Sequence, residues 1–337
     1  MTERADAGDA ADAEDGDGGD GLTYADAGVD IDASEAATAA LAGAVDVDDT
    51  GYAGLFTVDG RRFGLTTDGV GTKLLVAEAV GRFDTIGIDC VAMNVNDLVA
   101  AGLEPLAFVD YLAVDEPDDA LTAALGEGLA TGVRRADCAL VGGETAVLPE
   151  VVTGFDLAGA CVGVAPADAV FPGEAEVGDA LVGFASGGVH SNGLTLAREA
   201  LTREFDYGDP FPPAPDRTVG EELLEPTRIY TDLLPALREH PVHAAAHVTG
   251  GGWTNLERLG DYHYEIDDPF DAQPVFDLIA ECGDVAPAEM HRTFNMGTGF
   301  VVALPPAAAE TLAARTEGRV VGRVEAGSGV GIRGLSL

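Results

Sequence analysis

Apolar residues recur along the chain in short blocks that predict alternating helices and strands from about residue 22 onward. Residues 83–101 form a long apolar block typical of a helix, although Asn94, Asn96 and Asp97 interrupt it. Apolar and small residues alternate at 155–165 and predict a strand. The other predicted helices cover residues 32–43, 117–132, 194–202 and 227–240, and the other predicted strands cover 55–58, 62–66, 106–114, 138–141, 180–185, 243–248, 294–304, 318–324 and 328–332. Helices mixed with strands, and glycine-rich loops at strand ends, indicate an α+β or α/β protein.

A connector rich in proline, glycine and acidic residues, 166–178, divides this pattern into two halves. It predicts an N-terminal domain at 21–166 and a C-terminal α+β domain at 167–337. Residues 1–20 consist mostly of Asp, Ala, Gly and Glu, and this composition predicts a disordered, acidic tail.

The chain is strongly acidic, with 59 Asp and Glu against 18 Lys and Arg and a net charge of −41. Because 47% of the residues are hydrophobic, this charge predicts an acidic surface on a folded core rather than disorder. Lysine is nearly absent, since all basic residues except Lys73 are arginine. We interpret the composition as adaptation to a salt-rich cytoplasm, where screening weakens self-repulsion. Activity should then be lost in dilute buffer, and full activity there would contradict this interpretation.

Composition also excludes several classes of partner. No basic run could follow a nucleic acid backbone, so nucleic acid is not an expected partner. No apolar run approaches 18 residues and no basic-then-apolar signal opens the chain, so no membrane contact and a cytoplasmic location are expected. The distant cysteines, without a Cys-x-x-Cys pair, are expected to be buried free thiols: Cys90, Cys138, Cys161 and Cys282.

Polar residues mark the tips of four glycine-rich segments, at 68–73, 142–145, 186–193 and 249–252, each of which follows a predicted strand. Glycine lets a backbone approach a phosphate and present N–H groups to it. The spacings match neither a P-loop nor a dinucleotide-binding fingerprint. Together the segments predict a shared phosphate site in which Lys73 contacts a group whose geometry a guanidinium cannot satisfy.

Three acids are candidates for Mg²⁺, which prefers one or two carboxylates with phosphate oxygens and water. Asp68 and Glu144 lie in glycine-rich segments, and Asp97 interrupts an apolar helix, where an unpaired charge would be costly. His190 could transfer protons, donate to a phosphate, or simply bond the backbone of its loop. A zinc site at His243 and His247 is disfavoured, because the segment is strand-like and no third ligand is near. His247, beside Thr249, could still line the phosphate site.

In combination, the motifs resemble the phosphoribosylformylglycinamidine cyclo-ligases, also called aminoimidazole ribonucleotide synthetases. The resemblance spans residues 24 to about 300 and depends on the whole set of motifs, since single pieces are weak. The matching pieces are YADAGVDID at 24–32, TDGVGTKL at 67–74, FDTIGIDCVAMNVNDL at 83–98, LVGGETA at 140–146, AGACVG at 158–163, HSNG at 190–193, PTRIY at 226–230, HVTGGG at 247–252 and RTFN at 292–295.

The resemblance implies a two-domain α+β fold and a homodimer whose N-terminal domains share a β-barrel. It also implies ATP- and Mg²⁺-dependent closure of formylglycinamidine ribonucleotide to 5-aminoimidazole ribonucleotide through an iminophosphate. Carried over position by position, it makes Asp68, Lys73 and His190 catalytic candidates. Asp68, Asp97 and Glu144 would hold metal, and the ATP-binding candidates are Asp68, Gly69, Gly71, Thr72, Lys73, Asn96, Asp97, Gly142, Gly143, Glu144, Thr145, Ser191, Asn192, Thr249, Gly250 and Gly251.

Some positions depart from the family pattern. The glycine-rich loop after the first predicted helix is reduced to residues 50–55, and Trp253 replaces a Phe. Other members of the superfamily remain alternatives, among them formylglycinamidine ribonucleotide synthetase and thiamine monophosphate kinase. A non-catalytic, acidic cation-binding protein would also explain the net charge, but not the retention of Lys73.

Overall fold

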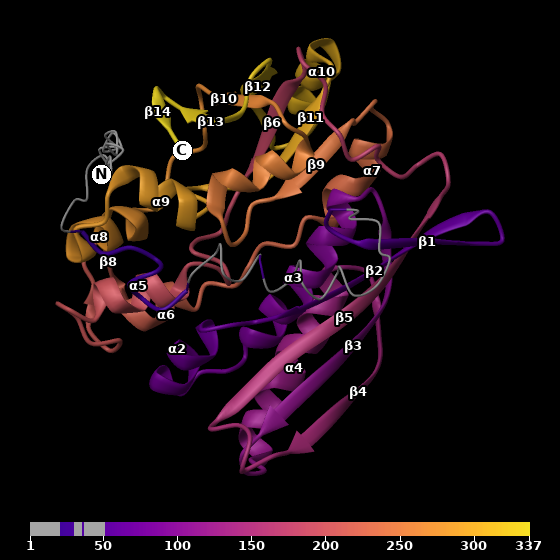
Figure 1. The fold of residues 1–337 in the computed structure, drawn as a ribbon. Helices are drawn as coiled ribbons and strands as arrows, with labels where there is room; N and C mark the ends of the chain where they lie inside the picture. The colour runs from indigo at the N-terminus through magenta and orange to yellow at the C-terminus, as the bar shows by residue number, and fades with distance from the viewer. Residues whose placement is uncertain (1–20, 30–35, 37–50) are drawn as a thin grey trace, which may run out of the picture.

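The computed structural model of the chain describes residues 21–29, 36 and 51–337. The predicted tail at 1–20 and, apart from residue 36, the predicted helix at 32–43 lie outside the described residues. Within them, helices and strands combine into two domains, each built around its own sheet (Figure 1). The fold is therefore of the mixed, two-domain α+β kind. No helix of this part of the chain is long and apolar enough to cross a membrane.

The N-terminal domain is built on a five-stranded sheet in the order β1-β2-β5-β3-β4. A hairpin joins β1 to β2 through Asp59 and Gly60, both with the positive φ that such tight turns require. Only β3 and β4 run parallel. The strands are β1 (Gly54–Val58), β2 (Arg61–Gly69), β3 (Glu104–Val114), β4 (Ala139–Val147) and β5 (Phe155–Pro166).

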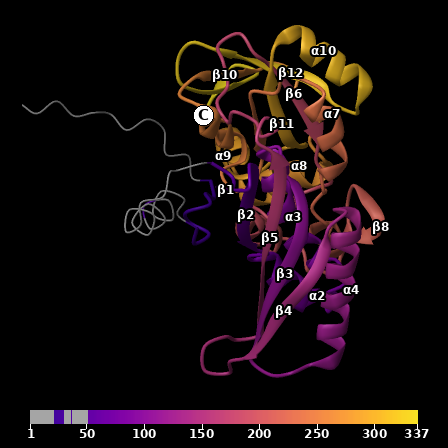
Figure 2. The same ribbon diagram turned by 90° about the vertical axis from the view of Figure 1, so that its right-hand side faces the viewer.

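Two helices cover one face of this sheet, α3 (Ile86–Ala100) and α4 (Asp119–Arg135), as Figure 2 shows. Asp118 caps α4 by accepting the N–H groups of Ala120 and Leu121. The helices approach closely because Gly87 faces the backbone of α4, where a Cβ would lie 2.1 Å from a backbone nitrogen. A short helix, α2 (Lys73–Val80), begins four residues after β2 ends.

The C-terminal domain holds a seven-stranded sheet in the order β14-β13-β10-β12-β6-β11-β9, with both faces covered. In β11 every residue is buried, and its side chains alternate between two hydrophobic clusters. The strands of this sheet are β6 (Ala180–Ala185), β9 (Ala244–His247), β10 (His263–Ile266), β11 (Thr298–Leu304), β12 (Arg319–Glu325), β13 (Gly329–Ile332) and β14 (Leu335–Ser336).

The α-helices of this domain include α5 (Leu194–Leu201), α6 (Val219–Leu223), α7 (Leu234–Arg238), α8 (Pro274–Gly283), α9 (Pro287–Thr293) and α10 (Pro306–Arg315), and the 3₁₀ helices include η1 (Thr231–Leu233) and η2 (Gly252–Leu259). Strands β7 (Pro210–Phe211) and β8 (Ala214–Thr218) form a separate small hairpin.

Several elements differ from the sequence predictions. The helix expected at 227–240 is reduced to η1 and α7, because residues 225–230 run irregularly along the domain junction. β4 continues through its glycines instead of ending before them. Helices α2, α8, α9 and α10 and strand β10 were not predicted. All four cysteines are free, but Cys138 and Cys282 are only half-buried.

The first described residues lie against the C-terminal domain, although they precede the N-terminal sheet in the chain. The N–H group of Leu22 donates to the Gly283 carbonyl at 3.1 Å. The N–H group of Tyr24 donates to the Glu289 carboxylate at 2.8 Å. Leu22 and Tyr24 are therefore attached to the end of α8 and to α9.

Candidate active site

Two of the predicted metal-binding acids come together where the domains meet. Asp68 lies near the end of β2 and Asp97 lies on α3, and the charge of Asp97 acts on Asp68. Burial, reinforced by that charge, raises the pKa of Asp68 to about 6. Asn94 donates from its amide to the Asp68 backbone carbonyl at 3.3 Å and so joins α3 to β2. Such a pair of partly desolvated carboxylates is suited to a divalent cation.

A histidine of the C-terminal domain contacts the same pair. The Nδ1 atom of His247, at the end of β9, lies 3.0 Å from an Asp97 carboxylate oxygen. Its Nε2 atom lies 3.2 Å from the side-chain nitrogen of Asn96. Both contacts cross the domain junction, because α3 packs against β9.

Lys73 lies in a different environment from the predicted one. It is the first residue of α2, its side chain is fully buried, and its Nζ lies 2.9 Å from both carboxylate oxygens of Asp89. Nζ also donates to the Glu225 carbonyl at 2.6 Å. Burial lowers the pKa of Lys73, and the Asp89 carboxylate opposes this shift. Lys73 therefore begins a helix instead of lying in a loop, and its ammonium is held by Asp89 and Glu225, so its contact with a phosphate stays a prediction.

The survival of this single lysine now has a physical explanation. A compact ammonium fits between one carboxylate and one carbonyl, whereas a planar guanidinium would need more space and more acceptors. The Oδ1 atom of Asp89 also accepts the N–H and the hydroxyl of Thr227, at 2.7 Å and 2.6 Å. Asp89 and Thr227 were missed in the sequence, although Asp89 interrupts the same apolar block that drew attention to Asp97.

His190, for which the sequence left three roles open, is buried within its loop. It is 1% exposed and has a φ of 66°, an uncommon left-handed conformation for a residue other than glycine. Its Nε2 accepts the N–H groups of Gly187 at 2.9 Å and Arg228 at 3.4 Å. Burial, followed by the nearby positive charges, holds the pKa of His190 well below its ordinary value, so the ring is neutral. This geometry matches the third possibility raised by the sequence, a histidine that bonds its own loop.

The rest of the 186–193 loop lies beside the 249–252 segment. A Cβ on Gly250 would lie 3.4 Å from the Asn192 side-chain oxygen. Ser191 shares a hydrogen bond of 3.1 Å with Thr227. Asn255 fixes the second segment, because it accepts from the Thr249 N–H at 2.7 Å and donates to the Gly250 carbonyl at 2.9 Å. Asn255 was not predicted from the sequence.

The third predicted acid, Glu144, does not join this group within one chain. Residues 142–145 are part of β4 and not a loop, which corrects the interpretation of their glycines. A Cβ on Gly143 would lie 2.2 Å from the Asp110 carboxylate, so this glycine makes room for a neighbouring side chain.

The register of the sheet explains this separation. Asp68 on β2 pairs with Gly159 on β5, which pairs with Asp110 on β3. Asp110 in turn pairs with Gly143 on β4, so these positions share one face of the sheet. Glu144 pairs with Tyr111 and lies on the opposite face.

The described residues contain no group of three His, Cys, Asp or Glu side chains arranged to hold a metal. Two carboxylates nevertheless suit Mg²⁺, which takes most of its ligands from phosphate and water. The two histidines of the disfavoured zinc site have different carboxylate partners. His243 pairs with Asp179 at 2.9 Å, and His247 pairs with Asp97.

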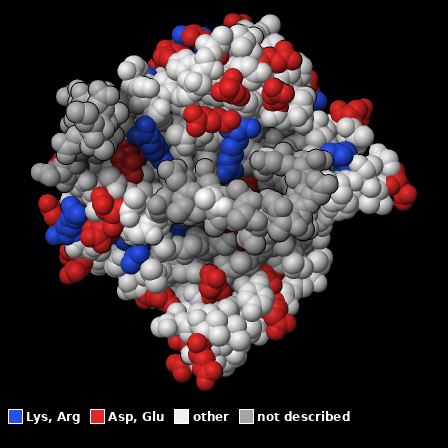
Figure 3. Space-filling model, in the orientation of Figure 1, with Lys and Arg blue, Asp and Glu red and all other residues white. Residues whose placement is uncertain are grey.

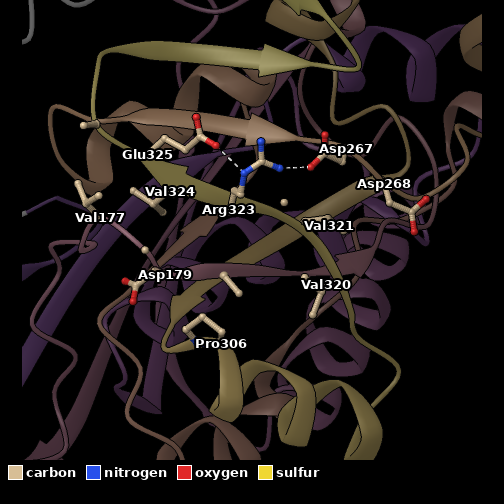
Figure 4. Close-up of a pocket in the computed structure, with 14 residues that line it drawn as sticks. Val177, Asp179, Asp267, Asp268, Pro306, Val320, Val321, Arg323, Val324 and Glu325 are labelled. Atoms are coloured by element: carbon tan, nitrogen blue, oxygen red, sulfur yellow. Dashed lines mark hydrogen bonds and ion pairs between the residues drawn. The ribbon is translucent and has the colours of Figure 1, made fainter.

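A well-formed cavity lies away from these residues. It has a volume of about 670 Å³ and lies on the C-terminal domain between β12, the start of α10 and the segment before β6 (Figure 4). Val177, Val320 and Pro306 line it, and Arg323 on its rim is held between Asp267 and Glu325 (Figure 4). None of the predicted site residues lines this cavity, so we do not assign it to the site.

The two domains and the junction between them define the class of protein. Residues 48–165 match the AIR synthase related protein, N-terminal domain, and residues 176–334 match the AIR synthase related protein, C-terminal domain. The chain belongs to this family, as its motifs indicated.

Curated relatives give the family a particular activity. The chain is 44% identical over 328 residues to the phosphoribosylformylglycinamidine cyclo-ligase of Methanosarcina acetivorans, covering 94% of this chain and 98% of the relative. It is 49% identical over 257 residues to the cyclo-ligase of Thermococcus gammatolerans, covering 76% and 75%. Among solved structures, AaThiL complexed with AMPPCP and TMP matches with a TM-score of 0.65 and 18% identity over 90% of this chain and 93% of that chain. At this identity the structural match concerns the fold alone.

Proposed function

We propose that this chain catalyses the ATP-dependent closure of formylglycinamidine ribonucleotide to 5-aminoimidazole ribonucleotide, with release of ADP and phosphate. The relatives at 44% identity over nearly the whole chain support this activity. The observation that carries the site is the meeting of Asp68 and Asp97 at the domain junction, beside the 186–193 and 249–252 segments. The AMPPCP in the AaThiL structure supports ATP as the nucleotide.

The chemistry follows from what these residues can bind and orient. A formyl oxygen is a poor leaving group, so phosphoryl transfer to it creates one that a nitrogen of the same substrate can displace. Catalysis of this kind depends mainly on positioning and on neutralising phosphate charge. Asp68 and Asp97 would hold Mg²⁺, which supplies positive charge to the phosphates when bound. The backbone of 249–252 and the side chains of Ser191 and Asn192 offer polar groups to the phosphates or the ribonucleotide.

Lys73 and His190 enter this proposal as positioning residues. Lys73 with Asp89 and Thr227 holds the start of α2 against the C-terminal domain, and Ser191 is attached to the same network through Thr227. His190 organises the loop that carries Ser191 and Asn192. Their contribution would be to keep the loops in place, which is a large part of catalysis by positioning.

We also propose a homodimer formed through the face of the N-terminal sheet that no helix of the described residues covers. That face exposes large apolar side chains, which usually marks an interaction surface. They are Phe56, Val58, Leu65, Val109 and Tyr111. β4, at the edge of the same sheet, is exposed along almost its entire length. Glu144 would then belong to an interface and could serve the site of a second copy.

The acidic surface supports the proposed adaptation to concentrated salt. Asp and Glu side chains are spread widely over the face in Figure 3, with few Lys and Arg among them. The only lysine is fully buried, where solvent salt does not reach it. Dense carboxylates on the surface repel one another less when screened.

The proposed activity is tested by incubating the protein with ATP, Mg²⁺ and formylglycinamidine ribonucleotide in high-salt buffer and detecting the aminoimidazole ribonucleotide. Asp97→Asn should lower turnover by about 100-fold or more, since even indirect metal partners contribute about 10–100-fold. The matched control, Asp277→Asn on the exposed face of α8, should leave turnover unchanged. ATP consumption without that product would contradict the proposed function.

A further inference from the structure

His247 lies in a position that the sequence does not explain. It belongs to the C-terminal domain, yet its completely buried ring points toward two neighbouring residues of α3 in the N-terminal domain. A second histidine at the start of the same segment, His243, makes an equivalent pair with Asp179, but that pair stays within one domain. The two pairs have similar distances, 3.0 Å and 2.9 Å, and differ in what their aspartates face.

The hydrogen-bond network determines which nitrogen of His247 carries the proton. The Asn96 side-chain oxygen accepts the Tyr230 N–H at 2.9 Å, which fixes the orientation of the amide. The Asn96 side-chain nitrogen donates to the Arg228 carbonyl at 2.9 Å and faces His247 Nε2 at 3.2 Å. Nε2 must therefore accept, so the proton is on Nδ1 and is donated to Asp97.

One oxygen of Asp97 is thereby held, and the other is left for a ligand. Within the described residues only the Oδ1 atom of Asp97 has a side-chain partner, His247. The Asp97 side chain keeps 21% of its surface exposed, whereas His247 keeps 1%. Hydrogen bonds from a histidine of this kind orient a carboxylate and restrict its rotation.

We propose that His247 is a positioning residue that orients Asp97 for the metal–nucleotide complex, so that the site forms only when the two domains are docked. This inference rests on the proposed function, which assigns the cation to Asp68 and Asp97. It goes further by making a residue of the C-terminal domain responsible for the geometry of an acid in the N-terminal domain. His247 itself would not touch the cation.

Two replacements separate its two contacts. His247→Asn places an amide nitrogen near the position of Nδ1 and can still donate to Asp97, whereas His247→Gln places its amide near Nε2 and loses that donor. Mn²⁺ affinity is measured by electron paramagnetic resonance in the presence of a non-hydrolysable ATP analogue. We expect the Gln variant to bind Mn²⁺ about 10–100-fold more weakly and the Asn variant to stay within about threefold of the parent. His243→Gln is the matched control and should bind Mn²⁺ like the parent.

Each outcome decides the question. Equal losses in the Asn and Gln variants, or no loss in the Gln variant, would overturn the positioning role. Thermal unfolding establishes that each variant is folded at the temperature of the measurement. If only the Asn variant folds, a parental Mn²⁺ affinity supports the inference and a tenfold loss overturns it, and if neither folds, His247 is structural and the inference fails. A parent chain that binds no Mn²⁺ with the analogue would instead refute the metal site in the proposed function.

Discussion

The two faces of the five-stranded sheet differ in what covers them and in which acids they carry. Helices α3 and α4 and the domain junction cover the face that holds Asp68 and Asp110. No described helix covers the opposite face, where Tyr111, which pairs with Glu144, and Leu65 are exposed. One strand therefore sends alternate residues into a core and into solvent. Acids that the motifs predict in one site, such as Asp68 and Glu144, can therefore lie on opposite faces of a single sheet.

The largest expected effect comes from the buried junction on the covered side. Lys73→Met leaves Asp89 without its counter-charge, and we expect the free energy of unfolding to fall by about 3–5 kcal/mol. Chemical denaturation in high-salt buffer measures it. The double variant Lys73→Met/Asp89→Leu should recover part of the loss, because no uncompensated charge remains. A single variant as stable as the parent would show that the pair is not a structural link.

The second prediction compares the stability contributions of two aromatic residues of β3 that lie on opposite faces of the sheet. Phe108 is fully buried on the covered face, and Phe108→Ala should lower the free energy of unfolding by about 3–5 kcal/mol. Tyr111 is 46% exposed on the opposite face, and Tyr111→Ala should change that of the separated subunit by no more than about 0.5 kcal/mol. Equal losses in denaturant melts of the two variants would mean that both faces are covered.

The third prediction concerns association through the face of the sheet that no described helix covers. Tyr111→Glu adds a charge to an already acidic surface and should weaken the proposed dimer by at least about 100-fold in dissociation constant. Analytical ultracentrifugation measures this change. Val177→Glu is the matched control, because Val177 is 58% exposed on the C-terminal domain, away from this sheet. A parental dimer in Tyr111→Glu would rule out this face as the interface.

The smallest effect concerns the pH dependence of metal binding on the covered face. Burial and the neighbouring Asp97 raise the pKa of Asp68 to about 6, so the folded, metal-free chain holds an extra proton between about pH 4 and pH 6. Asp68 therefore disfavours the folded state as pH rises through 6, and a bound cation removes that penalty. At pH 5.5 about three-quarters of Asp68 is protonated, so Mn²⁺ affinity should be roughly fourfold lower than at pH 7.5. Calorimetric titration that finds no such difference would contradict a role for Asp68 in binding.

Much of the fold and of the family was contained in the sequence. The Asp59-Gly60 hairpin and the apolar helix containing Asn94, Asn96 and Asp97 appear as predicted, because short-range turn chemistry and helical periodicity determine them. The motifs indicated the right family. Asp97 was recognised because a charge in an apolar helix needs a partner. The acidic composition likewise required a surface rich in carboxylates.

Only the tertiary structure decided where the motif residues point. A glycine in a sequence is equally consistent with a turn, a phosphate-binding loop or a close approach of two groups. Gly143 is of the third kind, because the Asp110 carboxylate occupies the space that a side chain would need. Two contacts join residues more than a hundred positions apart, from Lys73 to Glu225 and from His247 to Asp97. The backbone contact of His190 with Gly187 is local, but it too was decided by how the loop packs. A side chain's charge state and accessibility are set by whichever atoms surround it in space. Local sequence does not determine those atoms, so chemistry at a domain junction is decided only when the domains pack.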